Sequence, residues 1–309
     1  MIVNHVMSND VQSSIFNSIL SYFNKYTDND VKIVTSIAPI DGADVYHYHR
    51  PNLEKNIQKN SVITVHHDLN DNDEWLSIEK FIPKYKQAKK IICLNTLQKG
   101  LLHQYGIDNT VVIPHGVNRD IFKYIERPLK EGKDRKNILI TSKRYPRKVK
   151  GEAYLYELLR YLDVDKIHFV LVGENRSLDV DYFVKYGCSV EWHEYVPYRM
   201  FGNLYHSADF LLMCSYYEGG PANIPEAVAS GLPIICNPIG MAKDFVDDMD
   251  NGIYLTMDPK KDAETINSYL GDQYRELKQK AEKEETRSRA IGWDEVVFRN
   301  IEIYREIAK

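Results

Sequence analysis

Short apolar runs alternate with amphipathic stretches along almost the whole chain. The clearest helical pattern covers residues 11–26, where apolar residues recur every three or four positions. This alternation is typical of a parallel sheet whose strands are joined by crossover helices. In the first part of the chain, the apolar runs predict strands over 2–7, 31–37, 43–49, 61–67, 89–95 and 110–116.

A polar and basic stretch over 118–137 interrupts this pattern. It contains Pro128 and Gly132 and has little periodicity, so it predicts a crossing between two domains. Ligands of open parallel sheets gather beyond the carboxyl ends of the strands, so a cleft between two α/β domains is the expected site. After the crossing, the pattern predicts strands over 137–143, 167–174, 189–194, 209–215, 232–238 and 252–256, and helices over 152–162, 223–230, 260–285 and 293–308.

The composition is that of a globular protein, with 309 residues of which 43% are hydrophobic and 27% charged. A net charge of −4 argues against a nucleic-acid binder, whose affinity rests on excess Lys and Arg. The four cysteines form no metal knuckle or redox pair. The first residues lack the pattern of a signal peptide, and no apolar run approaches the roughly 20 residues that span a bilayer. We therefore expect a reduced, cytoplasmic chain.

The segment 215–240 combines a glycine-containing turn with two carboxylates. Gly219 and Gly220 follow a predicted buried strand and precede a predicted helix, an arrangement that lets backbone N–H groups approach an anion. Glu218 lies in the turn and Glu226 in the first helical turn, so both can face one cavity. A carboxylate accepts two hydrogen bonds from the vicinal hydroxyls of a ribose or hexose.

A second candidate segment, 142–151, follows the first predicted strand of the second half. Cations beside a helix start suit a diphosphate leaving group, whose negative charge grows as the glycosidic bond breaks. A basic loop facing water is the alternative interpretation. The cations of this segment are Lys143, Arg144, Arg147, Lys148 and Lys150, followed by Gly151.

Together these segments resemble the family 4-type retaining glycosyltransferases of the GT-B fold (glycosyl transferases group 1). The family signature is a Glu, seven residues and a second Glu, and the chain reads E-GGPANIP-E from Glu218 to Glu226. The resemblance implies an α/β fold of two Rossmann-like domains that face each other across a cleft. The N-terminal acceptor-side domain would cover 1–115 and be completed by the helix at 293–309, and the nucleotide-sugar domain would cover 116–292. Other matching segments are ADVYHYH, VITVHHD, IPHGVNRDIF, SADFLLMCS and DNGIYL.

The resemblance also implies a role for each matching residue. Arg144 and Lys150 would neutralise the donor diphosphate, and Glu226 would hold the donor ribose. Glu218 would bind hydroxyls of the transferred sugar, and His66 would lie near the reacting sugar, so these two are the expected catalytic residues. The remaining donor-binding residues would be Gly173, Val196, Gly219, Gly220 and Ala222, the last because Pro221 has no N–H to offer.

The activity that the resemblance implies is retaining, metal-independent transfer of a hexosyl or N-acetylhexosaminyl group from a nucleotide-diphosphate sugar. The acceptor would be a glycan, a lipid-linked glycan or another hydroxyl compound, in the assembly of a surface polysaccharide or glycolipid. No cofactor is expected. A non-catalytic partner of this fold, which binds nucleotide or stabilises an active glycosyltransferase, is the alternative. It is favoured by the missing glycine-rich loop after the first strand, where Ser8, Asn9, Ser13 and Ser14 stand instead.

Three further patterns bear on ligands and membranes. His47, His49, His66, His67 and His115 alternate along predicted strands without a completing carboxylate, which argues against a metal site. Adjacent strand residues point to opposite faces, so either His66 or His67 faces the cleft, and motif position favours His66. The segment 68–79 imitates a calcium loop but has Asp73 at the required glycine. The segment 80–90 interleaves Lys with apolar residues, which fits both peripheral contact with the inner membrane face and a solvated helix face.

Overall fold

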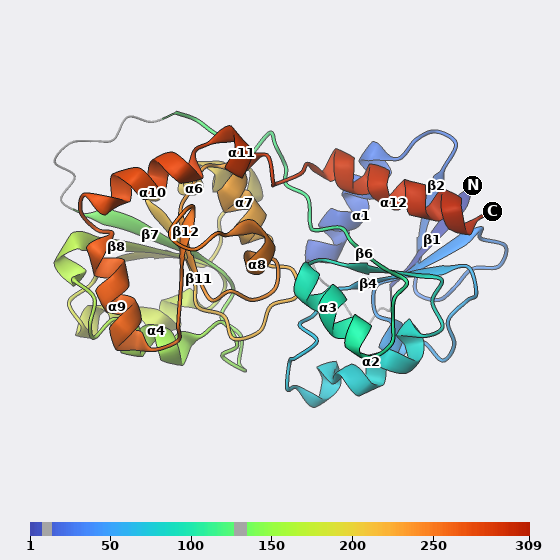
Figure 1. Ribbon diagram of the computed structural model, residues 1–309, viewed down its shortest axis with the longest axis horizontal. Coiled ribbons are helices and arrows are strands. Elements are labelled where there is room, and N and C mark those ends of the chain that lie inside the picture. Colours follow the sequence, from blue (N-terminus) through green and yellow to red (C-terminus); the bar gives the residue numbers. More distant parts are fainter. Residues whose placement is uncertain (8–13, 127–134) are drawn as a thin grey trace. The chain divides into compact units, whose positions relative to one another are not determined.

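The computed structural model describes residues 1–7, 14–126 and 135–309 (Figure 1). These residues form two compact units. The first unit comprises Met1–Gly116, Glu218–Gly220 and Ile291–Lys309, and the second comprises Val117–Tyr217 and Pro221–Ala290. Ser8, Asn9 and Ser13, together with Pro128 and Gly132, lie outside the described residues.

The first unit is built on a parallel six-stranded sheet with the order β2-β1-β3-β4-β5-β6. In Figure 1, α1 and α12 lie side by side on one face, and α2 and α3 cover the other. The helix α12 therefore returns the end of the chain to the first sheet. The strands are β1 (Ile2–Val6), β2 (Lys32–Ser36), β3 (Val45–Tyr48), β4 (Ser61–Val65), β5 (Lys90–Cys93) and β6 (Thr110–Val112), and the helices are α1 (Ser14–Tyr26), α2 (Ile78–Tyr85), α3 (Thr96–Gln104) and α12 (Trp293–Ile307).

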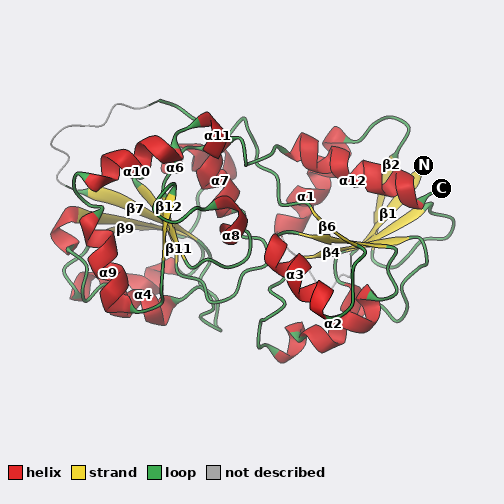
Figure 2. Cartoon of the chain, viewed as in Figure 1, coloured by secondary structure: helices red, strands yellow, loops and turns green. Residues whose placement is uncertain are grey.

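The second unit has its own parallel six-stranded sheet, with the order β12-β11-β10-β7-β8-β9. Figure 2 shows its strands surrounded by helices. The strands are β7 (Lys136–Thr141), β8 (Ile167–Val172), β9 (Ser189–His193), β10 (Phe210–Met213), β11 (Ile234–Cys236) and β12 (Gly252–Tyr254). The helices are α4 (Glu152–Leu158), α5 (Val180–Lys185), α6 (Phe201–Ser207), α7 (Asn223–Ala229), α8 (Ala242–Phe245), α9 (Pro259–Ser268), α10 (Gln273–Ala281) and α11 (Glu284–Arg287).

The predicted α/β fold class is confirmed, and each predicted strand segment overlaps an observed strand. The single helix predicted over 260–285 is wrong, because this segment forms α9, α10 and α11. Gly271 lies in the first break, where a residue without a side chain disfavours a continuous helix. At the second break, Lys283 has an extended backbone with φ −58° and ψ 140°.

The apolar residues of 80–90 belong to the core of the first unit. Ile78, Phe81 and Tyr85 are the buried residues of α2, and Phe81 is 1% exposed. These residues pack against β3, β4 and β5, whereas Ile82 is half-buried and Pro83 is exposed. Among the described helices, none combines the length and the apolar character needed to cross a membrane.

Candidate functional site

The two segments expected to bind the donor meet at the carboxyl ends of adjacent strands in the second unit. β7 and β10 are neighbours in the sheet, and the 142–151 loop follows the former. The backbone N–H of Tyr216, just beyond β10, donates to the carbonyl oxygen of Val149 at 2.8 Å. The sheet order thus brings together two loops that lie about 70 residues apart in the sequence, as expected for a ligand site of a parallel sheet.

Gly151 makes this approach possible. Its φ of 79° is in the left-handed region, and a Cβ at this position would overlap the carbonyl oxygen of Cys214. Glycine alone satisfies both conditions without strain. The 142–151 loop can therefore lie directly against the end of β10.

Arg144 is held by a buried carboxylate. Its Nε donates to Oδ1 of Asp179 at 2.8 Å, and the hydroxyl of Tyr156 donates to the same oxygen. The other oxygen, Oδ2, accepts from Nη1 of Arg176 at 2.7 Å. Asp179 is fully buried and Arg176 is 2% exposed, so water screens this network little. Because Asp179 engages Nε, the terminal nitrogens of Arg144 remain the groups that can meet a phosphate.

The other predicted residues of this loop region lie in different environments. Lys150 is half-buried, and its Nζ lies 5.6 Å from the ring centre of Tyr145. Gly173 follows β8 with a φ of 144°, and a Cβ there would lie 2.5 Å from the carbonyl oxygen of Ser142. Gly173 therefore lets the chain after β8 pack against the start of the 142–151 loop. Val196 is half-buried and follows β9 at the edge of the sheet.

Glu226 is buried in the first turn of α7 and bound by two tyrosines. The hydroxyl of Tyr205 donates to Oε2 at 2.8 Å, and that of Tyr198 donates to Oε1 at 3.2 Å. Burial raises the pKa of Glu226 to about 7, against the opposing effect of the tyrosine hydrogen bonds. The ring of Phe122 packs edge-on against Tyr205, with centroids 5.1 Å apart, and supports the hydrogen-bonded pair.

Glu226 is also linked to the start of the basic loop. The hydroxyl of Tyr205 lies 3.3 Å from Oγ1 of Thr141, the last residue of β7. Nδ2 of Asn223 donates to the carbonyl oxygen of Thr141 at 3.4 Å. Ala222 immediately precedes α7 and is half-buried. The second unit therefore brings the residues expected to bind the diphosphate and the ribose together around the end of β7.

Glu218, Gly219 and Gly220 group with the first unit instead. The N–H of Glu218 donates to Oδ2 of Asp68 at 3.1 Å, and Nδ2 of Asn95 donates to the carbonyl oxygen of Gly219 at 2.6 Å. A Cβ on Gly219 would lie 2.5 Å from the carbonyl oxygen of His66, and one on Gly220 would meet Leu94 at the same distance. Gly219 is thus required by close backbone approach, which brings the backbone of His66 next to the predicted glutamate turn, whereas Gly220 lies against a side chain.

His66 and His67 face opposite sides of the sheet. Nε2 of His66 lies 2.9 Å from Nδ1 of His49, and its ring packs edge-on against Phe16. His67 is buried on the other side, with its ring centre 4.1 Å from that of Phe81. His66 therefore belongs to a polar cluster, whereas His67 belongs to the apolar core under α2.

The sequence did not identify the residues that hold the predicted donor-binding side chains in place. Nothing in the sequence links Asp179 to Arg144. Tyr198 and Tyr205 carry no motif that distinguishes them from the other tyrosines. Asp68 could have been found, because it directly follows His66 and His67 at the carboxyl end of a strand. Its burial raises its pKa, while the N–H groups of Asn70 and Glu218 lower it.

Within the described part of the chain, His5, His47 and His49 are the grouping with ligand atoms close enough to share a metal ion, all within 4.8 Å of one another. Both ring nitrogens of His47 and of His49 already lie within hydrogen-bond distance of protein partners. A metal would have to displace these bonds, so the cluster fits a hydrogen-bonded network better than a metal site. Metal independence stays a prediction.

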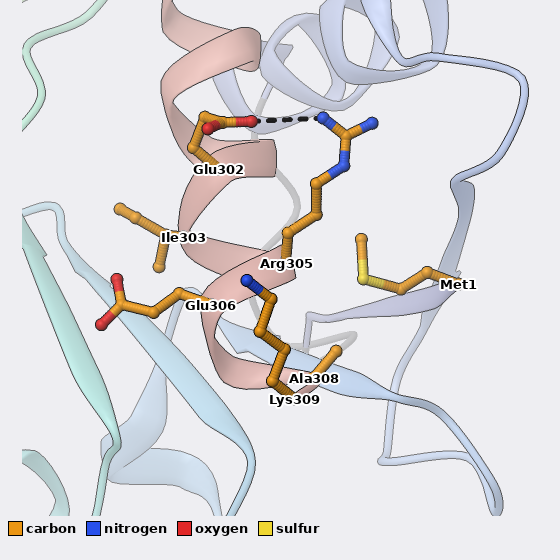
Figure 3. Close-up of a pocket in the computed structure, with 7 residues that line it drawn as sticks. All are labelled: Met1, Glu302, Ile303, Arg305, Glu306, Ala308 and Lys309. Carbon is orange, nitrogen blue, oxygen red and sulfur yellow. Dashed lines mark hydrogen bonds and ion pairs between the residues drawn. The ribbon is translucent and has the colours of Figure 1, made fainter.

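A hollow of about 610 Å³ lies beside the two ends of the described chain (Figure 3). Figure 3 marks the ion pair between Arg305 and Glu302. These two residues lie 3.2 Å apart, and Arg305 also binds Asp28 and Asp30. None of the predicted site residues lines this hollow, so it adds nothing to the candidate site.

A sequence profile of the family described as glycosyl transferases group 1 matches residues 122–288, more than half of the chain. The chain belongs to this family. The matched region contains the 142–151 loop, the glutamate turn and α7, so the candidate donor residues of this glycosyltransferase lie inside it. No curated protein matches the sequence significantly.

Solved structures with a fold similar to that of this glycosyltransferase include three proteins that illustrate the range of coverage. Sucrose-phosphate synthase from Thermosynechococcus elongatus is 14% identical, with a TM-score of 0.78 and 99% of each chain covered. HepE from Anabaena, solved with UDP and glucose, is 15% identical, with a TM-score of 0.71, 99% of this chain and 100% of HepE covered.

TarM from S. aureus is a longer protein with a similar structure. It was solved as a variant with fondaparinux, α-GlcNAc-glycerol and UDP. The match is 18% identical with a TM-score of 0.64, and it covers 84% of this chain but 55% of TarM. This glycosyltransferase thus spans about half the length of TarM, and at these identities the likeness shows the fold.

Proposed function

We propose that this glycosyltransferase transfers a hexosyl or N-acetylhexosaminyl group, with retention and without a metal, from a nucleotide-diphosphate sugar to a hydroxyl acceptor. The acceptor would be a glycan or a lipid-linked glycan, in surface polysaccharide or glycolipid assembly at the cytoplasmic face of a membrane. The observation that carries the donor part of the proposal is the convergence of Arg144 and Glu226 on the end of β7.

The chemistry of donor binding follows from the two environments. The guanidinium of Arg144, fixed through Asp179, presents planar N–H donors to diphosphate oxygens. The negative charge on the leaving diphosphate grows in the transition state, and a fixed cation stabilises that charge without reorganisation. Lys150 would add a second positive charge. Glu226, once ionised, can accept hydrogen bonds from the ribose hydroxyls.

In a retaining front-face reaction, the departing phosphate itself takes the acceptor proton. The protein then contributes cations at the phosphate, hydrogen bonds to the sugar hydroxyls and exclusion of water. Glu218 would hold sugar hydroxyls, and His66, which is close to the same turn, would bind the reacting sugar. This division of roles needs no metal, since Arg144 and Lys150 supply the positive charge.

Uridine diphosphate is the first nucleotide to test. Structures of HepE include complexes with UDP and with UDP-glucose, and the pneumococcal transferase GtfA was solved with UDP and GlcNAc. UDP-glucose and UDP-GlcNAc are therefore the first donors of choice.

The test of donor binding is calorimetric titration of UDP, GDP and ADP in the presence of EDTA. Arg144→Ala and Lys150→Ala are each expected to weaken UDP binding roughly 10- to 100-fold, the range for a lost hydrogen bond to a charged group. Lys166→Ala is the matched control. It removes the same charge from an exposed pair with Asp163, before β8 and away from the carboxyl ends of the strands. Equal losses in all three variants, or no binding of any nucleotide, would refute the donor site.

The test of chemistry is the anomeric configuration of the product by NMR with a hydroxyl acceptor and either UDP-sugar. Retention supports the proposal, and inversion contradicts it. If UDP binds but neither transfer nor donor hydrolysis is seen with any acceptor, the alternative of a non-catalytic partner is favoured. In that case Glu218→Ala would leave partner binding intact, whereas in an enzyme it abolishes turnover.

A further inference from the structure

A row of buried histidines lies behind His66 in the first unit. β1, β3 and β4 are neighbours in the sheet, and the register pairs His5 with His47. His5, His47 and His49 are at most 2% exposed, whereas His66 is half-buried. Tyr304 of α12 is fully buried over the same strands. His66 is therefore the most exposed member of this polar row, and the other members are buried.

The ring nitrogens form a continuous chain of hydrogen bonds. Nδ1 of His49 lies 2.9 Å from Nε2 of His66, and Nε2 of His49 lies 3.0 Å from Nδ1 of His5. Nε2 of His5 lies 3.4 Å from the hydroxyl of Tyr304, which lies 2.6 Å from Nδ1 of His47. Nε2 of His47 lies 2.7 Å from Oγ1 of Thr64. The order is Thr64, His47, Tyr304, His5, His49, His66.

These imidazoles are neutral. Burial is the main cause that lowers the pKa of His5, His47, His49 and His66, and for His49 the pKa falls to about 3. The neighbouring histidines and Arg50 lower these values further, and no carboxylate in the described part of the chain raises any of them. The titratable groups that lower the pKa of His66, besides its burial, are His49, His115, Arg50 and His67.

Counting hydrogens leaves two arrangements. A neutral imidazole or a hydroxyl has one hydrogen to donate, so the six groups carry six hydrogens for the five links between them. One hydrogen must therefore fall at an end of the chain, either on Thr64 or on Nδ1 of His66. Each inner group donates one hydrogen bond and accepts one, so all five hydrogen bonds point the same way along the row. The position of the extra hydrogen therefore fixes the tautomer of His66.

The end at Thr64 is the unfavourable place for that hydrogen. Thr64 is 7% exposed, and within the described residues its hydroxyl is within bonding distance of His47 alone. A buried hydroxyl hydrogen that gives up its bond to water and gains no acceptor in the protein destabilises that arrangement. At the other end, Nδ1 of the half-buried His66 can reach a ligand or water.

We infer that this chain, running from Thr64 through His47, Tyr304, His5 and His49, holds His66 in the Nδ1–H tautomer and makes it a hydrogen-bond donor to an oxygen of the bound sugar or phosphate. The part of this inference that concerns the ligand rests on the proposed function. The five residues behind His66 are positioning residues. His66 itself does not accept the proton of the acceptor hydroxyl, because its lone pair at Nε2 is occupied by His49.

A small cavity supports a positioning role. It has a volume of about 30 Å³ and is lined by His47, His49, Thr64, His66 and His115 among others. This volume is about that of one water molecule in the liquid. The interior of the cluster has no room for a sugar or a nucleotide, so the buried histidines can affect a ligand only through His66.

The test is the ¹⁵N NMR spectrum of histidine-labelled, ligand-free protein at pH 7, with His66 assigned by its loss in His66→Gln. Each neutral tautomer has a distinct pair of ring ¹⁵N shifts. The wild type is expected to show Nδ1–H at His66. Tyr304→Phe cuts the chain at its middle and is expected to convert this signal to a mixture of both tautomers. This spectrum needs no turnover, so its outcome is independent of whether the proposed reaction occurs.

Tyr85→Phe is the matched control. Tyr85 is also a fully buried tyrosine of the first unit, but its hydroxyl has no hydrogen-bond partner among the described residues, so the tautomer is expected to stay as in the wild type. Thr64→Val is the second cut, used if Tyr304→Phe does not fold. The Nε2–H tautomer or an imidazolium at His66 in the wild type would overturn the inference. So would an unchanged tautomer in the cut chain, or stoichiometric zinc binding at His5, His47 and His49.

Discussion

Nε of Arg144 donates a hydrogen bond to Oδ1 of the buried Asp179 at 2.8 Å. The same carboxylate pairs with the buried Arg176. One acidic side chain thus connects Arg144, the residue proposed to bind the diphosphate, with the interior of the second unit. The position of Arg144 is thus determined by packing, and this makes the proposed donor site sensitive to changes that do not touch the ligand.

Asp179→Asn is expected to destabilise the protein by about 3–5 kcal/mol, because it leaves the charge of Arg176 buried with reduced compensation. It is also expected to weaken UDP binding, since Arg144 loses its anchor. Urea denaturation and calorimetry measure the two effects. Asp163→Asn, which breaks an exposed pair with Lys166, should change stability by less than about 1 kcal/mol. A stable Asp179→Asn protein with normal UDP affinity would contradict the positioning role.

The stability of the second unit should depend on the ionisation of Glu226. Its pKa rises from 4.5 to about 7 on folding, so the folded state holds a proton that the unfolded state has released between these values. Stability from this group therefore falls as the pH rises from about 4.5 to about 7, by about 3 kcal/mol in total. Denaturation at several pH values should show this slope in the wild type and its loss in Glu226→Gln. Equal slopes would contradict the raised pKa.

Nucleotide binding should show the opposite pH dependence. The ionised carboxylate of Glu226 accepts hydrogen bonds from ribose hydroxyls, whereas the protonated form has lost part of that capacity. UDP affinity is therefore expected to rise as the pH increases through about 7. Glu226→Gln should bind UDP more weakly above this pH and with little pH dependence. A 2′-deoxy or 3′-deoxy nucleotide should reduce the pH dependence in the wild type.

Gly151→Ala tests the contact between the two donor loops. The new Cβ would overlap the carbonyl of Cys214, in addition to the strain of a positive φ. Gly187→Ala is the control, with a φ of 78° but a nearest atom 3.9 Å away. Gly151→Ala is expected to lose about 1–3 kcal/mol more than the control, the range for overpacking. Its UDP affinity should also fall, because the 142–151 loop must shift. Equal unfolding midpoints for the two variants would contradict the tight contact.

Phe81→Ala tests whether the apolar residues of 80–90 belong to the core. Phe81 is 1% exposed, so its truncation should cost about 3–5 kcal/mol in unfolding free energy. Trp75→Ala, at a residue that is 55% exposed in the same unit, should change stability by less than about 0.5 kcal/mol. If Phe81→Ala kept its stability but lost binding to anionic vesicles, α2 would be a membrane-contact surface after all.

The sequence alone was enough to locate the strands. Apolar runs that fill inner parallel strands such as β4 and β10 are buried on both faces, so each is visible as a continuous local pattern. The single helix predicted over 260–285 was wrong because the helical periodicity of this segment continues across Gly271 and Lys283, where the backbone turns. Periodicity reports which residues are buried, and it does not report how the chain bends between two helices.

The sequence by itself determined which kinds of residue are available to bind the donor. These are two carboxylates eight positions apart, a basic loop after a strand, and glycines. These depend on covalent chemistry and local spacing. Only the tertiary structure decided which groups hold them, because Asp179 meets Arg144, and Tyr205 meets Glu226, through contacts between distant segments. The same holds for the histidine row. The order in which β1, β3 and β4 pair depends on crossovers and core packing, and that order alone makes His5, His47, His49 and His66 neighbours.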